Sequence, residues 1–309
     1  MKYVITGGAG FIGSHIAEEL LHEGHDVVIY DNLLTGKREN IAHLESRENL
    51  TFVTGSILDF PGLKTAFQDA DGIFHEAAIV SVPRSVADPA ETHEVNLTGT
   101  LNVLMAARDG GVKKLVFASS AAVYGDDPVL PKCESMLPDL ISPYAVSKIA
   151  GEYYCSVFTR LYGVNCTALR YFNVFGPRQD PTSPYSGVIT KFITNCLAHR
   201  PIVIFGDGNQ TRDFVFVKDV VQANIRAMKS GKDGAFNVAC GAQLALNELA
   251  GIIMDLTGIT VPVVYESPRA GDIRESYAEI TQVKNTIGYS PQFTVRSGLE
   301  KTVTWYKDQ

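Results

Sequence analysis

The sequence predicts an α/β fold with a doubly wound parallel sheet, on three observations. The first half of the chain alternates short runs rich in valine and isoleucine with longer segments of helical periodicity. Those runs are apolar throughout, as in parallel strands that are covered on both faces. A glycine-rich turn, Gly7–Gly13, follows the first run directly. Together these features are typical of a Rossmann-like sheet, in which ligands bind at the carboxyl ends of the strands.

Six strands are expected in this half, and helical patterns separate them. The strands are Tyr3–Thr6, Asp26–Tyr30, Thr51–Thr54, Gly72–His75, Lys114–Ala118 and Asn165–Tyr171. The helices are Phe11–His22, Leu63–Gln68, Pro89–Arg108 and a longer one that begins at Ser142-Pro143 and ends near Gly163. Serine suits the cap and proline the first turn of that last helix, and glycine suits its end.

The regular alternation of strand and helix patterns ends after Gly176. A loop over Gln179–Gly187, a helix to about His199, short strands at Ile202–Phe205 and Asp213–Val217, and further helices follow. We interpret this region as a smaller mixed α/β portion that binds the substrate. The predicted division is 1–173 for the dinucleotide-binding domain and 174–309 for the smaller domain, with chain crossings between the two allowed.

Composition narrows the function further. The 309 residues carry a net charge of −7 with scattered lysines and arginines, which argues against nucleic-acid binding. Because no segment approaches the ~20 apolar residues of a membrane span, and glycines follow Ile5 at once, we expect a cytoplasmic protein without a signal peptide. The cysteines form no CxxC pair and no cluster with histidine, so we expect reduced thiols and no metal: Cys133, Cys155, Cys166, Cys196 and Cys240.

The glycine turn predicts a dinucleotide site. Backbone N–H groups in such a turn can approach a pyrophosphate, and the N-terminus of the following helix favours negative charge. Asp31 ends the second strand 18 residues after Gly13, where its carboxylate would accept the adenosine ribose hydroxyls. That carboxylate would repel a 2′-phosphate, so NAD is favoured over NADP, although Lys37 and Arg38 lie nearby. The alternative, a simple strand–helix turn, is disfavoured by this context.

A serine, a tyrosine and a lysine predict acid–base chemistry beside that site. Tyr144 and Lys148 are four residues apart on one face of a helix, and Ser119-Ser120 follows a strand at the cleft edge. An unperturbed tyrosine is only about 0.1% ionised at neutral pH, and acting as a base would need about 4 kcal/mol of phenolate stabilisation. A lysine ammonium and an oxidised nicotinamide could supply this stabilisation of the phenolate. A Tyr-x3-Lys pair without the serine and the cofactor site often lies on a solvated surface instead.

These motifs resemble those of the extended short-chain dehydrogenase/reductase family. Within that family the chain is most similar to UDP-glucose 4-epimerases and their UDP-N-acetylglucosamine relatives, over essentially its whole length. The matching motifs are Gly7–Gly13, Asp31-Asn32-Leu33, His75-Glu76-Ala77-Ala78, Asn96, Ser119-Ser120-Ala121, Tyr144 with Lys148, Tyr171-Phe172-Asn173-Val174 and Thr211-Arg212-Asp213-Phe214.

The resemblance implies a set of site residues. The implied catalytic residues are Ser120, Tyr144 and Lys148. The implied NAD contacts are Gly7, Gly10, Phe11, Ile12, Gly13, Asp31, Asn32, Ser56, Ile57, Ala77, Ala78, Asn96, Tyr144, Lys148 and Tyr171. The implied substrate contacts are Ser119, Ser120, Tyr144, Asn173, Arg212, Arg274 and Ser276. One departure is Ser56, where the family often has an aspartate against the adenine, so a hydroxyl replaces a carboxylate there.

The expected function is therefore NAD-dependent 4-epimerisation of a UDP-sugar through a transient 4-keto intermediate. UDP-glucose and UDP-galactose are the expected pair, with UDP-GlcNAc and UDP-GalNAc also accepted because Ser276 is small. UDP-glucuronate epimerases and decarboxylases are alternatives, as is a non-catalytic NAD-binding sensor. Related 4,6-dehydratases carry an acidic pair where this chain has Ala121-Ala122, which disfavours dehydration. The family also implies a homodimer, formed by helices around Asn96–Arg108 and Tyr144–Tyr162.

Overall fold

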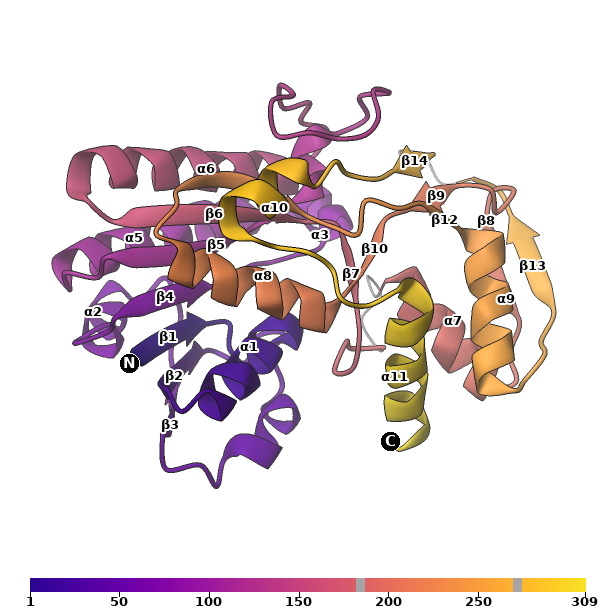
Figure 1. The fold of residues 1–309 in the computed structure, drawn as a ribbon, viewed down its shortest axis with the longest axis horizontal. Helices are drawn as coiled ribbons and strands as arrows, with labels where there is room; N and C mark the ends of the chain where they lie inside the picture. The colour runs from indigo at the N-terminus through magenta and orange to yellow at the C-terminus, as the bar shows by residue number, and fades with distance from the viewer. Residues whose placement is uncertain (182–186, 269–273) are drawn as a thin grey trace.

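A seven-stranded parallel sheet forms the centre of the molecule in the computed structural model, which describes residues 1–181, 187–268 and 274–309. The strand order is β11-β6-β5-β4-β1-β2-β3, so the sheet winds outward in both directions from the middle (Figure 1). Its strands are β1 (Lys2–Thr6), β2 (Asp26–Asp31), β3 (Leu50–Thr54), β4 (Gly72–His75), β5 (Lys114–Ser120), β6 (Asn165–Tyr171) and β11 (Gly234–Val238). The predicted α/β fold is confirmed.

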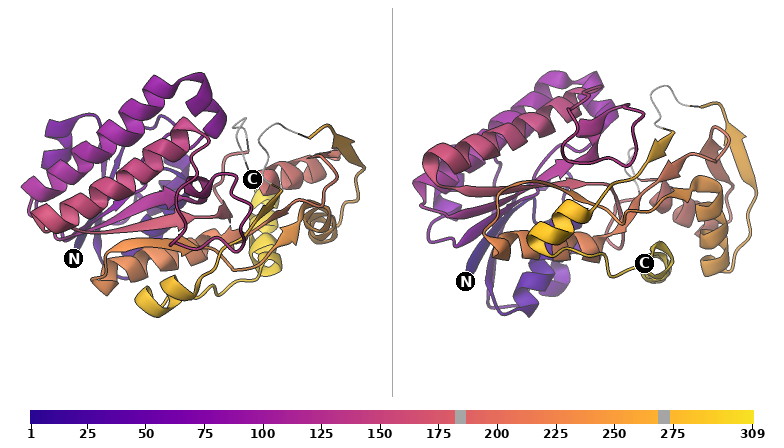
Figure 2. Two further views of the ribbon diagram at one scale, coloured as in Figure 1. Left: turned by 90° about the horizontal axis from the view of Figure 1, so that it is seen from above. Right: turned by 45° about the horizontal axis from the view of Figure 1, so that its top comes forward.

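Helices cover both faces of this sheet, as the turned views show (Figure 2). One face carries α2 (Phe60–Ala66), α5 (Gly99–Asp109) and α6 (Pro143–Tyr162), and the other carries α1 (Phe11–His22), α8 (Val217–Ser230) and α10 (Thr281–Ile287). Because side chains alternate along a strand, β1 sends Val4 into the layer under the first group of helices. Tyr3 and Ile5 pack into the layer under the second group.

Helix α6 begins and ends as its sequence predicts. The Ser142 side chain accepts the Ala145 N–H at 3.2 Å, and Pro143 occupies the first turn. Gly163 ends the helix in the left-handed conformation with a φ of 71°. Three short helices precede it on the same side of the molecule: α3 (Val82–Ala87), α4 (Pro89–His93) and η4 (Ala121–Tyr124).

The expected helix over Pro89–Arg108 contains a π-helical turn. Residues Glu94–Thr98 (η3) wind more widely than the α-helical segments before and after them. Such turns are rare and occur often at functional sites. This one includes Asn96, a predicted cofactor contact. Helix α3 was not among the predicted elements.

The smaller portion lies beyond the carboxyl ends of the sheet strands (Figure 1). It contains a two-stranded pair β7 and β10, a second pair β8 and β13, and a three-stranded sheet in the order β12-β9-β14. These strands are β7 (Asn173–Phe175), β8 (Ile202–Phe205), β9 (Thr211–Arg212), β10 (Phe214–Phe216), β12 (Leu244–Ala245), β13 (Val263–Glu266) and β14 (Glu275–Ser276). Its helices are α7 (Val188–Leu197), α9 (Leu246–Thr257) and α11 (Val295–Lys307). Two 3₁₀ turns, η1 (Arg38–Asn40) and η2 (Ala42–Leu44), complete the described elements.

Chain crossings and ion pairs connect the smaller portion to the central sheet and its helices. Helix α8 and strand β11 return to the central sheet from beyond residue 173, so that β11 pairs with β6 in parallel. On α1, Glu18 accepts a hydrogen bond from Arg178 at 2.8 Å and pairs with Lys218 at 3.3 Å. The smaller portion is therefore fixed against the helix that follows the glycine turn.

All five cysteines are free thiols. Across the described ranges, no helix has both the length and the apolar character to cross a membrane. No cluster of histidine, cysteine, aspartate and glutamate side chains there has the grouping of a metal site.

Candidate active site

The glycine turn is built for a close approach of backbone to ligand. Gly7 has a φ of 73°, and a Cβ on it would lie 2.6 Å from the amide nitrogen of Ala77. A Cβ on Gly13 would lie 2.3 Å from the Gly7 carbonyl oxygen. Neither position can hold a side chain, so the turn stays tight between the ends of β1 and β4.

Helix α1 begins at this turn, so its N-terminus lies next to the carboxyl end of β1. Gly10 is the N-cap residue and offers no side-chain acceptor, so the first amide groups, those of Phe11, Ile12 and Gly13, have no capping partner from it. Those amides and the helix dipole suit a pyrophosphate. The residues present therefore fit a dinucleotide.

Asp31 lies beside the same turn at the end of β2. One carboxylate oxygen accepts the Ala9 N–H at 2.9 Å, and the other accepts the Leu33 N–H at 2.8 Å. Burial raises the pKa of this carboxyl, whereas the two backbone hydrogen bonds lower it. Each carboxylate oxygen can accept a further hydrogen bond, as recognition of ribose hydroxyls requires.

The predicted adenine-side residues make local contacts. The Asn32 side chain accepts the backbone N–H two residues on at 3.1 Å, and the Ser56 hydroxyl does the same at 3.2 Å. Ile57 is buried against Gly99 of α5. The cations near Asp31 have partners: Lys37 pairs with Asp180 at 2.9 Å, and Arg38 pairs with Glu45.

Ser120, Tyr144 and Lys148 meet at the carboxyl end of β5. The Ser120 hydroxyl accepts the Ala122 N–H at 3.1 Å and is hydrogen-bonded to the Tyr144 phenol. The Lys148 ammonium donates to the Ala118 carbonyl at 2.8 Å and lies 5.7 Å from the centre of the Tyr144 ring. The structure therefore brings together the three residues that the sequence predicts as catalytic.

Burial controls the ionisation of this group. It raises the pKa of Tyr144 to about 12, although the hydrogen bond to Ser120 lowers it. It also lowers the pKa of Lys148 to about 8, while the nearby carboxylates of Glu76 and Glu152 raise that value. Without a further positive charge beside it, Tyr144 therefore stays protonated at neutral pH and is a poor base.

Ser119 is turned away from this group. Its hydroxyl donates to Glu152 of α6 within the buried interior. Glu152 also accepts two hydrogen bonds from Arg170, whose guanidinium reaches the Tyr124 hydroxyl at 2.9 Å. Glu152 and Tyr144 both lie on α6, and the two serines contact different positions of that helix. The structure thus brings Ser120, and not Ser119, to Tyr144.

Asn96 acts on the loop that follows β4. Its side chain accepts the Ile79 N–H at 2.7 Å and donates to the Ile79 carbonyl at 2.9 Å. It also donates to the Ser147 hydroxyl of α6. Asn96 is buried, so its visible role is to fix the segment that begins with Ala77 and Ala78, both partly exposed at the strand end.

Tyr171 and Glu76 form a further polar contact at this edge. The Tyr171 hydroxyl donates to Glu76 Oε1 at 2.9 Å. Burial raises the pKa of Glu76 to about 7, while the Tyr171 hydrogen bond and Lys148 lower it. The sequence analysis did not select Glu76, although it lies inside the quoted His75-Glu76-Ala77-Ala78 motif. Both ring nitrogens of His75 are hydrogen-bonded, one to Thr6 and the other to Thr100, so the side chain holds neighbouring elements together.

Backbone hydrogen bonds connect the strands and loops that carry the predicted substrate residues of the smaller portion. Arg212 on β9 and Ser276 on β14 are register partners, and the Thr211 N–H donates to the Arg274 carbonyl at 2.9 Å. Arg274 is exposed and pairs with Asp207 at 3.2 Å. Asn173 begins β7, and its N–H donates to the carbonyl of the residue after Arg212 at 3.1 Å.

Asp213 connects the segments that carry these residues, and the sequence analysis gave it no role. Its carboxylate accepts backbone N–H groups from Cys240, Gly241, Ala242 and Ala278. The side chain is fully buried, and burial raises its pKa to about 6. One carboxylate thus joins β10, the loop after β11 and the segment after β14.

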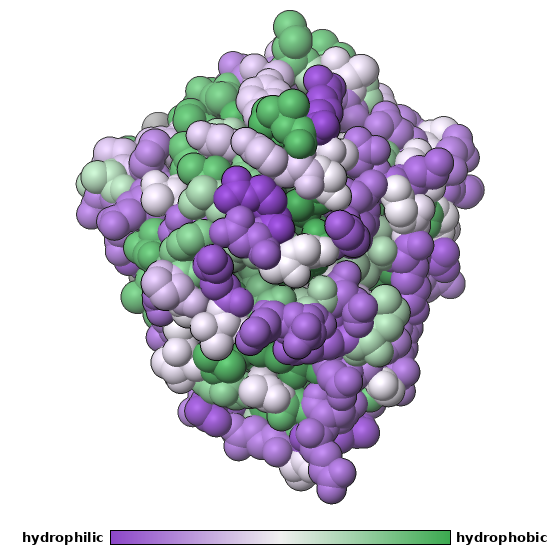
Figure 3. All heavy atoms as spheres, turned by 90° about the vertical axis from the view of Figure 1, so that its left-hand side faces the viewer, coloured by the Kyte–Doolittle hydropathy of each residue, from purple (hydrophilic) through white to green (hydrophobic). Residues whose placement is uncertain are grey.

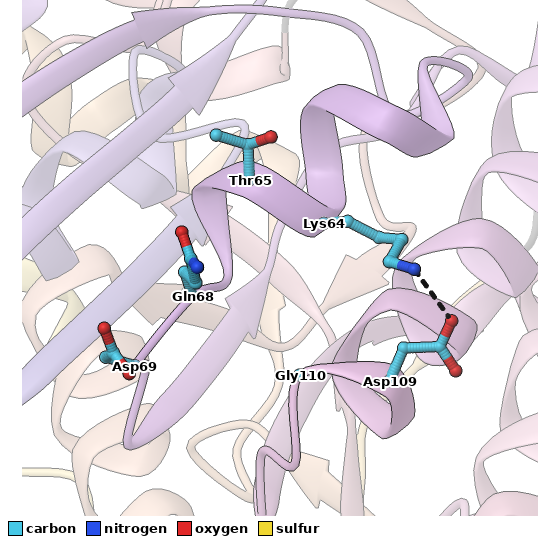
Figure 4. Close-up of a pocket in the computed structure, with 6 residues that line it drawn as sticks. All are labelled: Lys64, Thr65, Gln68, Asp69, Asp109 and Gly110. Carbon is cyan, nitrogen blue, oxygen red and sulfur yellow. Dashed lines mark ion pairs between the residues drawn. The ribbon is translucent and has the colours of Figure 1, made fainter.

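A surface pocket elsewhere is lined by none of the predicted site residues. Lys64, Thr65, Gln68, Asp69, Asp109 and Gly110 line it, and Lys64 pairs with Asp109 at 3.6 Å (Figure 4). These residues lie just before β4 and β5 begin, at the edge of the sheet opposite the glycine turn. Polar and apolar residues are interspersed over that end of the molecule (Figure 3). In α/β sheets ligands bind at the other edge, so we place the active site there.

Comparisons with known proteins agree with this geometry. The model of the NAD dependent epimerase/dehydratase family matches residues 3–239. A UDP-glucose 4-epimerase of Mycolicibacterium smegmatis is 40% identical over 313 residues, which cover 100% of this chain and 99% of that protein. A UDP-N-acetylglucosamine 4-epimerase from Methanobrevibacter ruminantium, in complex with UDP-N-acetylmuramic acid, is 42% identical with a TM-score of 0.96. That comparison covers 100% of this chain and 98% of that one.

Other similar proteins differ in their substrates. A UDP-glucose 4-epimerase of Thermus thermophilus in complex with NAD is 38% identical, with a TM-score of 0.90 and 99% coverage of each chain. A UDP-glucuronate 4-epimerase of Thermodesulfobacterium geofontis is 34% identical, over 99% of this chain and 96% of that protein. A UDP-N-acetyl-α-D-glucosaminuronate decarboxylase of Bacillus cytotoxicus is 36% identical, over 99% and 98%.

Proposed function

The chain belongs to the NAD-dependent epimerase/dehydratase family and is an enzyme that uses NAD, and we propose that it is a UDP-sugar 4-epimerase. The observation that carries the proposal is the meeting of Ser120, Tyr144 and Lys148 at the carboxyl end of β5, and the smaller portion adds Arg212 and Arg274. An acid–base group and a pair of guanidinium groups suit a sugar attached to a diphosphate.

The proposed chemistry assigns one role to each residue. Bound NAD would supply the acceptor for a hydride from C4 of the sugar and the source from which that hydride returns to the opposite face. Tyr144 removes the proton of the 4-hydroxyl and gives it back. Because Ser120 already accepts the Ala122 N–H, its own hydrogen is available to donate to Tyr144 or to the sugar oxygen. Lys148 stabilises the phenolate with its positive charge.

The guanidinium groups would hold the nucleotide while the sugar turns. The Arg212 side chain donates to the Arg274 carbonyl at 3.4 Å, and Asn173 lies on β7, which pairs with β10 directly after Arg212 and Asp213. We propose that these residues bind the uridine diphosphate. The sugar needs freedom to rotate about its link to the diphosphate, so that the 4-keto intermediate presents both faces.

Dehydration fits this site poorly. The turn η4 begins directly after Ser120 with Ala121 and Ala122, whose methyl groups cannot transfer a proton. Epimerisation or decarboxylation of a uronic acid remains the alternative, because relatives with those activities are similar over their whole length. A non-catalytic NAD sensor is disfavoured because the Tyr144 and Lys148 pair is intact.

We also propose that two copies associate through α5 and α6. Exposed apolar side chains form a stripe along α6: Val146, Tyr153, Val157 and Leu161, whose exposed fractions are 47%, 60%, 42% and 70%. Their spacing of seven and four residues places them on one helical face. Leu101 and Met105 of the adjacent α5 are only partly buried. A second copy of the chain would cover this stripe.

The test is an assay of the purified protein with a panel of UDP-sugars. UDP-glucose, UDP-N-acetylglucosamine, UDP-glucuronate and the glucose derivative of thymidine diphosphate are incubated separately, and the products are separated by chromatography and identified. Conversion to the 4-epimer without net formation of NADH supports the proposal. Release of carbon dioxide or of a 4-keto-6-deoxy sugar as the main product would refute it.

A further inference from the structure

The Asp213 side chain is a buried acid that the proposed reaction does not use. It lies between Arg212, a proposed diphosphate contact, and Phe214, the first residue of β10. A buried carboxylate is costly unless hydrogen bonds satisfy its oxygens. Here four donors do so, and all of them are backbone N–H groups. The side chain therefore acts on the main chain of other segments.

Three of these donors are consecutive and belong to the loop that leads from β11 to β12. The Cys240 N–H donates to Oδ1 at 2.8 Å, and the Gly241 and Ala242 N–H groups donate to Oδ2 at 2.9 Å and 3.3 Å. Gly241 has a φ of 71°, and such a left-handed residue lets successive N–H groups converge on one anion. Strand β12 follows this loop and pairs with β9, the strand that carries Arg212. The carboxylate thus fixes the loop that leads to the neighbour of Arg212.

The fourth donor belongs to the segment after β14. The Ala278 N–H donates to Oδ2 at 3.3 Å, two residues beyond Ser276. The main chain of Asp213 adds a further connection, because its carbonyl accepts the Asn173 N–H at 3.1 Å and the Asn173 side-chain amide at 3.2 Å. Asp213 is therefore bonded to, or adjacent in the chain to, the segments that carry three of the proposed substrate contacts: Asn173, Arg212 and Ser276.

We propose that Asp213 is a positioning residue for substrate binding, whose carboxylate holds Arg212 and Ser276 in the relative arrangement that a UDP-sugar requires. Strands β9 and β14, which carry these two residues, are only two residues long. Pairing of such short strands fixes them weakly, so hydrogen bonds from outside the contact residues must support the geometry. This inference rests on the proposed function, because the ligand is the UDP part of the substrate.

The proposed role affects binding and not the chemical step. Ser120, Tyr144 and Lys148 lie on β5 and α6, whereas the hydrogen-bond partners of the Asp213 carboxylate lie after β11 and after β14. A change at Asp213 should therefore misplace the residues that hold the nucleotide and leave the acid–base group intact. In kinetic terms it should raise KM and leave kcat close to the wild-type value.

The test compares two buried aspartates. Asp213→Asn keeps the size of the side chain but replaces one acceptor oxygen with an NH₂ group, which then faces a backbone N–H whichever way the amide is turned. Asp219→Asn is the matched control. Asp219 on α8 is also buried, and its carboxylate accepts the Gln292 and Phe293 N–H groups at 2.7 Å and 3.2 Å. Both variants lose an acceptor for a backbone N–H, but only Asp213 is bonded to the proposed substrate segments.

The first measurement is the affinity of the NAD-loaded protein for UDP, by calorimetry. We expect D213N to bind UDP about tenfold or more weakly than wild type, because a buried donor left unpaired displaces the segments it belongs to. D219N should bind UDP as wild type does, even if its thermal stability falls as much. With a UDP-sugar that is converted, D213N should raise KM by a similar factor and change kcat by less than about twofold.

Hydrogen–deuterium exchange locates the effect without any substrate. In D213N, exchange should become faster in peptides that contain residues 240–242 and 278, which lose their acceptor. In D219N, the faster peptides should be those that contain residues 292 and 293. Loss of protection in all of these peptides in D213N would mean general loosening of the fold and would overturn a local positioning role.

The remaining outcomes separate the two proposals. Equal losses of UDP affinity in D213N and D219N, no loss in D213N, or a fall in kcat at unchanged KM would overturn the role of Asp213. A selective loss of UDP affinity in D213N, in a protein that converts no UDP-sugar, would support that role and refute the proposed function alone. A wild-type protein that does not bind UDP would overturn both. If D213N does not fold, Asp213→Ser, which keeps one hydroxyl acceptor, takes its place under the same criteria.

Discussion

Ser276 and Arg212 are register partners on the parallel strands β14 and β9, so their side chains lie on the same face of that short sheet. Tyr277, the next residue, points to the opposite face by alternation. If Arg212 holds the diphosphate, then Ser276, which shares the face of Arg212, also faces the sugar, and Tyr277 does not. This relationship supports the assignment of Ser276, and not Tyr277, to the position that limits the size of the 2-substituent.

We therefore predict that the enzyme accepts UDP-N-acetylglucosamine and UDP-N-acetylgalactosamine as well as the simple hexoses. Ser276→Tyr should remove most activity on the acetamido sugars, because the ring would occupy the volume of the acetamido group. Activity on UDP-glucose should change little. Kinetics on both sugar pairs tests this, with Ser276→Ala as the control. A wild-type enzyme inactive on acetamido sugars would contradict the prediction.

Tyr144→Phe should lower kcat by ~10²–10⁴-fold, because only the oxygen that transfers the proton is removed. Circular dichroism and NAD binding should remain close to wild type, since the ring stays in place. Tyr162→Phe at the exposed end of the same helix is the matched control and should be fully active. Wild-type turnover in Tyr144→Phe would mean that another group is the base.

NAD should bind more tightly than NADP by about tenfold or more, because Asp31 would accept ribose hydroxyls and repel a 2′-phosphate. Calorimetry on nucleotide-free protein measures both affinities. Asp31→Asn should reduce the difference between the NAD and NADP affinities, because it weakens NAD binding. Lys37→Ala should leave it unchanged, because Lys37 already pairs with Asp180. A wild-type preference for NADP would rule out this role of Asp31.

The proposed association of two copies predicts a dimer mass in light scattering at micromolar concentration. Val157→Glu combined with Leu161→Glu should shift the mass to that of a monomer, since charges would be buried in the contact. Leu137→Glu, at a leucine outside the α6 stripe that is more exposed than Leu161, should remain dimeric. A monomeric wild type would show that the stripe has another role.

Acid should destabilise the fold partly through His75. Burial lowers its pKa to about 3, below the ordinary 6.5, so the neutral form is favoured in the folded protein. A depressed pKa contributes stability above pH 6.5 that is lost as the pH falls toward 3. His75→Gln should flatten the free energy of unfolding over this range by up to ~1.4 kcal/mol per pH unit. Urea unfolding at several pH values measures it, with exposed His22→Gln as the control. An unchanged slope would contradict the assignment.

The elements that were predicted correctly are those whose sequence signals, such as apolar runs and cap residues, lie within or next to the element itself. The strands from β1 to β6 are apolar runs bounded by turns, and α6 carries its own cap and stop residues. Strand β11 was missed because its short sequence, Gly234–Val238, becomes a strand by pairing with β6 far away in the chain. The π-helical turn that contains Asn96 was likewise not predicted, and this side chain bonds to Ile79, 17 residues earlier in the chain.

The same distinction holds for the site. The glycine turn and the Tyr144 and Lys148 pair are visible because their spacing is local. Burial in the folded protein raises the pKa of Glu76, while Tyr171 and Lys148 lower it, and none of these surroundings is local in the sequence. Ser119 and Ser120 look equivalent in the sequence, and only the buried Glu152 and Arg170 pair separates their directions. Asp213 joins three segments that no sequence motif connects.

The return of the chain to β11 has a consequence for synthesis on the ribosome. Strand β6 can pair on one side only until residue 238 has emerged, because β11 supplies its other neighbour. Helix α8, which covers β5 and β6 on one face, is made just before that strand. A nascent chain that stopped at residue 173 would carry the whole glycine turn and the catalytic helix, yet expose a strand edge and an apolar sheet face to aggregation. The sheet of the first 173 residues would thus be completed only after nearly half of the residues beyond 173 have been translated.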